Sequence, residues 1–207
     1  AVESCMKIAL QYQVAAGFED RVKFISRERS YHGDSLGAAA VSGMKERRML
    51  FQPALKEVSF LSPVNMYRPV LGVAPEDLAA HCAQELEDEI LRLGPETVCA
   101  FIFEPVVGSA GGAIPAPAGY GERVRQICSH YGVLLIADEV LCGVGRTGTW
   151  RASEQDNFVP DIMSIAKGLG GGVIPLAAAV YSDHVAELIE AKHGAIATGH
   201  TFTAHTA

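Results

Sequence analysis

The most constraining feature of the sequence is an alternation of short apolar runs with amphipathic segments. Two of the runs, Thr97–Phe103 and Val133–Ala137, are almost wholly apolar and have the length of a strand. Between them, Gly119–Tyr131 has the apolar spacing of a helix and is followed by Gly132, a typical helix stop. Strands that are apolar on both faces belong to parallel sheets with helices on each side. The sequence therefore predicts an α/β fold of three layers around a mostly parallel sheet.

Other segments extend this alternation along the chain. Helices are expected over residues 2–15, 35–42, 76–93 and 182–191, and strands over residues 22–25, 162–165 and 176–180. Residues 50–75 contain Pro53, Pro63 and Pro69 and are expected to be irregular. A length of 207 residues corresponds to about one domain or a little more.

Charge and cysteine content exclude several classes of function. Lysine and arginine number 17 against 24 aspartates and glutamates, a net charge of −7, which disfavours nucleic-acid binding. No window is apolar for the ~18 residues that a membrane span needs. Five widely spaced cysteines without a C-x-x-C pair favour reduced thiols over disulfides or zinc. The expected location is intracellular and cytoplasmic, with a mitochondrial location left open.

Charged residues follow three of the predicted strands. Because ligands of such sheets bind at the carboxyl ends of the strands, these residues are candidate site residues: Glu104, Asp138 and Lys167. A lysine at a buried strand end loses solvation, which lowers its pKa and lets its amine form a Schiff base with an aldehyde. A buried aspartate needs a cation or a protonated ring nitrogen. Tyr31, before the turn at Gly33, can lie flat on a ring.

A pyridoxal cofactor requires this combination of a lysine for its aldehyde and an acid on its pyridinium nitrogen. From the residues alone, a surface lysine, an aspartate in a cap or ion pair, and a tyrosine used for packing remain open. Residues 143–148 match G-x-G-x-x-G, but they do not open a helix directly after a strand, so a dinucleotide site is rejected. The seven histidines do not cluster with acids, and no metal site is predicted.

Taken in order, these motifs resemble the class III pyridoxal-phosphate-dependent aminotransferases of fold type I. The resemblance spans the whole chain and is carried by SYHG at 30–33, the Glu-Pro and glycine motif at 104–112, IADEV through GVGRTG at 136–148, IAKG at 165–168 and GHTF at 199–202. It implies pyridoxal 5'-phosphate as cofactor. It also implies a transaminase that moves an amino group from an amine or ω-amino acid to a 2-oxo acid through a Schiff base on Lys167.

The resemblance implies a role for each matching residue. The catalytic residues are Lys167, which also moves the proton between substrate and cofactor, and Asp138, the acid on the pyridine nitrogen. The implied cofactor contacts are Tyr31 stacked on the ring, His32 supporting its loop, Glu104 organising the pocket, Val140 on the opposite ring face, Asp138 and Lys167 themselves, and Thr201. Thr201 would reach across a homodimer interface to the partner's cofactor phosphate.

Two departures from the family pattern concern the substrate. Asp34 stands where branches that act on ornithine or acetylornithine typically have arginine, and Ser109 where they often have a gating glutamate. Both differences make the pocket resemble those of the ω-amino-acid and amine branches. The expected partners are thus a small-molecule amine and a 2-oxo acid, with no nucleic acid and no membrane.

The resemblance also bears on domain organisation. Ala1-Val-Glu3 matches a helix that the family precedes with a phosphate-binding Gly-Ser or Gly-Thr pair. We therefore expect residues 1–207 to be an internal fragment, the large PLP-binding domain, without its N-terminal segment and C-terminal small domain. Two alternatives stay open: another PLP reaction on the same fold (decarboxylase, racemase or phospho-lyase), or a catalytically incomplete binding module.

Overall fold

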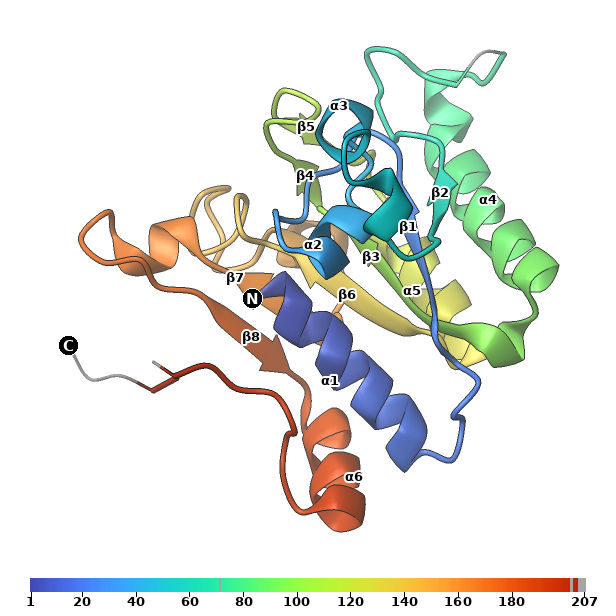
Figure 1. The fold of residues 1–207 in the computed structure, drawn as a ribbon. Coiled ribbons are helices and arrows are strands. Elements are labelled where there is room, and N and C mark those ends of the chain that lie inside the picture. Colours follow the sequence, from blue (N-terminus) through green and yellow to red (C-terminus); the bar gives the residue numbers. More distant parts are fainter. Residues whose placement is uncertain (71, 202, 205–207) are drawn as a thin grey trace.

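A six-stranded sheet forms the centre of the computed structural model, which describes residues 1–70, 72–201 and 203–204 (Figure 1). The strand order is β2-β1-β3-β6-β7-β8. Their bounds are β1 Lys23–Arg27, β2 Ser59–Leu61, β3 Val98–Phe103, β6 Leu134–Asp138, β7 Ile162–Ile165 and β8 Ala178–Tyr181. All neighbouring pairs are parallel except β7 and β8. The predicted α/β class and mostly parallel sheet are confirmed.

Helices cover both faces of this sheet (Figure 1). One face carries α4 (Leu78–Leu93) and α5 (Tyr120–Tyr131), and the other carries α1 (Val2–Ala15), α2 (Leu36–Val41) and α6 (Asp183–His193). β3 is buried at every position, with Phe101 and Phe103 in the first of these cores and Cys99 and Ile102 in the second. Burial on both faces explains why this strand is an unbroken apolar run.

Local sequence signals set several helix ends. α5 lies between Gly119 and Gly132, which adopt left-handed backbone conformations with φ of 80° and 66°. α6 begins after Ser182 and ends at Gly194, also left-handed. Short 3-10 turns complete the connections: η1 Gln52–Ala54, η2 Pro75–Asp77, η3 Pro95–Thr97, η4 Ala152–Asp156 and η5 Lys167–Gly170.

The expectation that residues 50–75 are irregular is wrong in part. β2 lies in this segment and pairs with β1 as the edge strand of the sheet. The hairpin of β4 (Val106–Val107) and β5 (Ile114–Pro115), and the short helix α3 (Lys45–Arg48), were also not expected. Strands of two or three residues are too short to show an alternating pattern, and they are defined by pairing with distant residues.

The cysteines and helices agree with the predictions made from cysteine spacing and apolar content. All five cysteines are free and buried, which confirms the expectation of unpaired interior thiols. Among the helices of the described residues, none has both the length and the apolar character required to cross a bilayer.

Gly43, just after α2, is expected to tolerate no side chain. A Cβ at this position would overlap the carbonyl oxygen of Arg27 and come within 2.7 Å of the Arg29 nitrogen, both backbone atoms. We expect Gly43→Ala to lower the free energy of unfolding by about 1–3 kcal/mol through overpacking, measured by urea denaturation. The control is Gly199→Ala, where a Cβ meets nothing within 4 Å; an equal loss in both variants would contradict the steric explanation.

Candidate functional site

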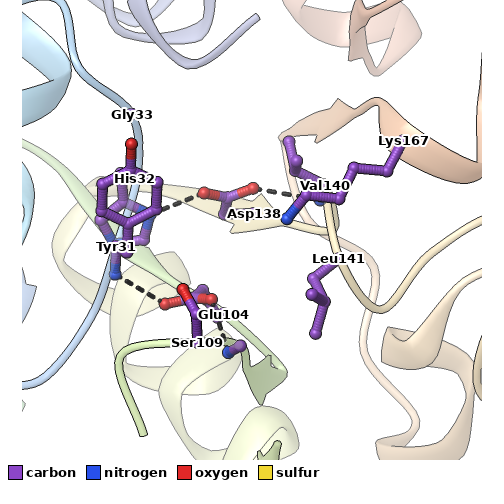
Figure 2. Close-up of a pocket in the computed structure, with 10 residues that line it drawn as sticks. Tyr31, His32, Gly33, Glu104, Ser109, Asp138, Val140, Leu141 and Lys167 are labelled. Carbon is purple, nitrogen blue, oxygen red and sulfur yellow. Dashed lines mark hydrogen bonds and ion pairs between the residues drawn. The ribbon is translucent and has the colours of Figure 1, made fainter. Parts of the chain in front are cut away.

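A cavity of about 110 Å³ lies where β3 and β6 end, beside the turn after β7 (Figure 2). The residues that bound it come from four segments: Tyr31, His32, Gly33, then Glu104, Gly108, Ser109, then Asp138, Val140, Leu141, and Lys167. The structure thus brings together six of the seven residues predicted for the site. Figure 2 shows Tyr31, His32 and Glu104 on one side of Asp138, and Val140, Leu141 and Lys167 on the other.

Asp138, the last residue of β6, is only 4% exposed, and three groups hold its carboxylate. Its Oδ2 lies 2.7 Å from Nδ1 of His32. Its Oδ1 accepts hydrogen bonds from the Ser164 hydroxyl at 2.8 Å and from the Val140 N–H at 3.1 Å. A carboxylate has about four lone-pair sites. Three partners therefore leave Asp138 able to accept one further donor from the cavity.

His32 contacts Asp138 directly, whereas the sequence predicted only support of the neighbouring loop. Its side chain is fully buried, and its Nε2 lies 3.4 Å from the Ser26 hydroxyl. Its backbone N–H donates to the Ser42 hydroxyl at 2.8 Å. Both ring nitrogens and the backbone N–H of His32 therefore have polar partners, and the imidazole is held in one orientation against the Asp138 carboxylate.

Glu104 joins two walls of the cavity. Its Oε1 accepts the backbone N–H of Tyr31 and its Oε2 accepts that of Gly108, both at 2.9 Å. The side chain is buried, and desolvation raises the pKa of the Glu104 carboxyl. The charge of nearby His32 and the two hydrogen bonds act in the opposite direction. Glu104 thereby sets the backbone position of Tyr31, which lines the cavity.

The expectation that Lys167 is buried at a strand end is wrong. β7 ends at Ile165, and Lys167 begins η5 with an exposed side chain. Its unusual feature is a left-handed backbone with φ of 44°. For a residue other than glycine this conformation costs roughly 1–2 kcal/mol and persists only where the surrounding structure imposes it.

The segment after Asp138 packs beside the Lys167 turn. The G-x-G-x-x-G run at 143–148 forms turns and opens no helix in the described residues, which agrees with rejecting a dinucleotide site.

Glu139, next to Asp138, is fully buried, and its carboxylate accepts the N–H groups of Ala152 at 2.6 Å and Ser153 at 2.9 Å. A Cβ built on Gly168 would lie 3.6 Å from the Cβ of Val144. The turns at 143–148 therefore lie against the turn that carries Lys167.

Cys142 follows Leu141, which bounds the cavity, and its thiol is buried. Burial raises the pKa of its thiol to about 12, and the charges of Glu139, Asp138 and Glu104 act in the same direction. The thiol therefore stays protonated, and only a thiolate is an effective nucleophile.

Thr201 is the one predicted site residue that the structure does not bring to the cavity. It lies in an exposed turn near the C-terminal end and is not among the described residues that line the cavity. Phe202, the last residue of the GHTF motif, lies outside the described residues.

Sequence reasoning missed two serines that hold the buried site. Ser164 is the one hydroxyl in the apolar run of β7, and the strand register places it opposite Asp138. Ser26 follows Phe24 and Ile25 in β1, and its hydroxyl lies beside His32. A polar residue inside an otherwise apolar strand is a signal that could have identified Ser164, but β1 also contains Lys23 and Arg27, so this signal does not single out Ser26.

The acids of the site and His32 are not arranged as a metal centre in the part of the chain that the structure describes. Over residues 1–70, 72–201 and 203–204, no group of three or more histidine, cysteine, aspartate or glutamate side chains is arranged to hold an ion.

Comparison with known families gives a match over almost the whole chain. The family described as aminotransferase class-III matches residues 1–206. An uncharacterized aminotransferase of Bacillus subtilis, YodT, is 43% identical over 205 residues, which cover 99% of this chain and 46% of the relative. Gamma aminobutyrate transaminase 3 of Solanum lycopersicum is 39% identical over 209 residues, covering 99% of this chain and 40% of the relative.

Solved structures share the fold. An amine transaminase from an uncultivated Pseudomonas species, determined with PLP bound, superposes with a TM-score of 0.93 at 37% identity. The match covers 98% of this chain and 46% of that one. The chain therefore spans about half the length of the proteins it matches.

The raised pKa of Glu104 predicts how its replacement changes stability with pH. Above the ordinary glutamate pKa of 4.5 and up to the raised value, the folded protein binds more protons than the unfolded chain. The wild-type free energy of unfolding therefore falls as pH rises through this window. Glu104→Gln removes this pH dependence of the free energy of unfolding, and it leaves one backbone N–H without its acceptor. We expect the loss of stability in this variant to be largest near pH 4.5 and to shrink toward neutral pH, as measured by urea denaturation.

The matched control is Glu89→Gln on α4. Hydrogen bonding to Arg92 lowers the pKa of Glu89, so its contribution is lost as pH falls and its variant should show the opposite trend. If the stability lost in Glu104→Gln instead grows as pH rises, the raised pKa of Glu104 in the folded protein is contradicted.

Proposed function

The chain belongs to the class III aminotransferase family, and on this premise we propose that the protein is a pyridoxal 5'-phosphate-dependent transaminase. It would move an amino group from an amine or ω-amino acid to a 2-oxo acid. The observation that carries the proposal is that Lys167, Asp138 and Tyr31, from three segments far apart in sequence, line one cavity. These residues supply an amine, an acid and an aromatic face.

The residues present fit a pyridine ring that carries an aldehyde. Asp138 keeps one acceptor site for a protonated ring nitrogen, and its other partners hold it in place. Tyr31 on one wall, with Val140 and Leu141 on the other, provides aromatic and apolar surface for a planar ring. Lys167 is the one lysine among the residues that bound the cavity.

The proposed roles follow from this chemistry. When bound, the cofactor supplies an electron sink for the electrons released at the substrate carbon. The Lys167 amine would hold the cofactor aldehyde, and the same amine would carry the proton that the substrate carbon loses. The Asp138 carboxylate would accept the protonated ring nitrogen, and the buried imidazole of His32 contacts that carboxylate and holds it in place. Glu104 holds the Tyr31 wall in position.

An amine or ω-amino acid is the proposed donor class. Ser109 lines the cavity where a gating glutamate is expected in the ornithine branches, so no carboxylate is placed at that point. Relatives of the chain include a protein named for γ-aminobutyrate, and a solved neighbour is an amine transaminase. A 2-oxo acid is the corresponding amino-group acceptor.

We further propose that residues 1–207 supply the large cofactor-binding domain and that the protein acts as a homodimer, with Thr201 reaching the partner's cofactor phosphate. Support comes from the exposure of Thr201 and its separation from the cavity of its own chain.

Lys167→Ala is expected to abolish covalent attachment of the cofactor. In the full-length protein the visible absorption of lysine-bound cofactor should disappear, and transamination should fall by at least about 100-fold, since proton transfer alone contributes this much. Absorption spectroscopy and a coupled transaminase assay provide the measurements. The control is Lys192→Ala on the exposed end of α6. Normal transamination by Lys167→Ala would refute the proposed function.

A half-reaction distinguishes transamination from other reactions on this fold. With γ-aminobutyrate or 1-phenylethylamine and no 2-oxo acid, we expect about one equivalent of carbonyl product per site, because the amino group stays on the enzyme. Subsequent addition of pyruvate or 2-oxoglutarate should then release one equivalent of amino acid. Carbon dioxide release, racemisation or phosphate elimination without any transfer would instead support one of the alternative reactions.

A further inference from the structure

Arg27 is a buried cation beside the cavity that the proposed roles do not use. It is the last residue of β1 and is 2% exposed. In the part of the chain that the structure describes, no carboxylate lies within ion-pair distance of its guanidinium, and its Nε and Nη1 have no hydrogen-bond partner. Buried arginines are ordinarily paired, so the unpaired N–H groups of Arg27 lower the stability of the fold.

Two aromatic rings fix the orientation of this guanidinium. Its Cζ lies 5.1 Å from the ring centroid of Phe103 and 5.1 Å from that of Tyr120. The two rings meet edge to face, with centroids 5.7 Å apart and planes at 85°. Cation–π contacts in a desolvated setting favour a planar guanidinium over a flexible ammonium.

Among the described residues, the guanidinium makes one hydrogen bond, and it is to Glu104 of the site. Arg27 Nη2 donates to the backbone carbonyl of Glu104 at 3.0 Å. The carboxylate of the same Glu104 accepts the N–H groups of Tyr31 and Gly108. At its own backbone, Arg27 accepts the Ser30 hydroxyl at 2.7 Å. Arg27 is thus linked to both segments that Glu104 joins.

We propose that Arg27 is a positioning residue that holds Glu104, and through it the Tyr31 backbone and the Gly108 turn, in the geometry required to bind the cofactor. The inference rests on the proposed function for its cofactor readout, but the geometry it asserts exists in the protein without cofactor. A purely structural arginine would stabilise the whole fold, whereas a positioning residue acts on the residues that Glu104 holds.

The decisive variant is Arg27→Met, because methionine fills much of the same volume without a charge. Replacing buried ionic groups by apolar side chains of similar volume is often neutral or stabilising, provided that no partner charge is left unpaired, and among the described residues Arg27 has no carboxylate partner. We therefore expect an unchanged or higher Tm in the full-length protein, together with at least tenfold faster amide hydrogen exchange at Tyr31 and Gly108 in the cofactor-free form. The Kd for pyridoxal phosphate should rise at least fivefold, with a changed visible circular dichroism of the bound cofactor.

Arg21→Met is the matched control. Arg21 also donates to backbone carbonyls, at Tyr131 and Gly132, and lies 4.8 Å from the ring centroid of Phe18, but it precedes the amino end of β1, whereas Arg27 lies at the carboxyl end. Its replacement should leave exchange at Tyr31 and Gly108 and the cofactor Kd unchanged.

Arg27→Lys keeps the experiment decisive if Arg27→Met fails to fold. The lysine retains the buried charge but loses the planar contact with both rings, and it should also accelerate exchange at Tyr31 and Gly108. Wild-type exchange at these two amides in the folded variant would overturn the proposal, as would acceleration spread equally over all buried amides. The exchange result stands apart from the proposed function, which the Lys167→Ala absorption experiment tests separately.

Discussion

The burial of the Asp138 carboxylate is the constraint on which the rest of the site depends. A carboxylate at the end of a strand inside the sheet is unfavourable unless polar groups compensate for lost water. His32 from the β1 connection, Ser164 from the neighbouring strand and the Val140 N–H provide that compensation. Three separate segments must therefore converge on one point. Their convergence also forms the walls of the cavity, so a requirement of folding and the geometry of the site coincide.

A second buried carboxylate, that of Glu104, holds the Tyr31 wall of the cavity in position. Glu104 is bonded to two backbone N–H groups rather than to a cation, and burial raises its pKa. Its carbonyl is in turn held by Arg27, a cation without a carboxylate partner. Separating a buried anion from a buried cation is less favourable than pairing them. The arrangement instead fixes the backbone on both sides of Glu104, a common compromise where a site must be preorganised.

The elements that could be predicted are those determined by local pattern. β3 is an unbroken apolar run, β6 is apolar up to its last residue, Asp138, and α5 is bounded by two glycines, so their type and approximate limits follow from nearby residues. β2, β4 and β5 were missed because strands of two or three residues are defined by partners far along the chain. The burial expected for Lys167 was wrong although the strand ends at Ile165 as predicted, because the chain then turns so that the Lys167 side chain is exposed, with a left-handed backbone at this residue.

The sequence by itself determined the α/β class, the family to which the chain belongs, and the residue types at the strand ends. These follow from apolar periodicity and motif spacing, which are properties of neighbouring residues. Only the tertiary structure decided which of these residues meet: that His32 contacts Asp138, that Ser164 lies opposite it in register, and that Arg27 reaches Glu104. Such contacts join residues up to 106 positions apart, and strand order and register, rather than local propensity, bring them together.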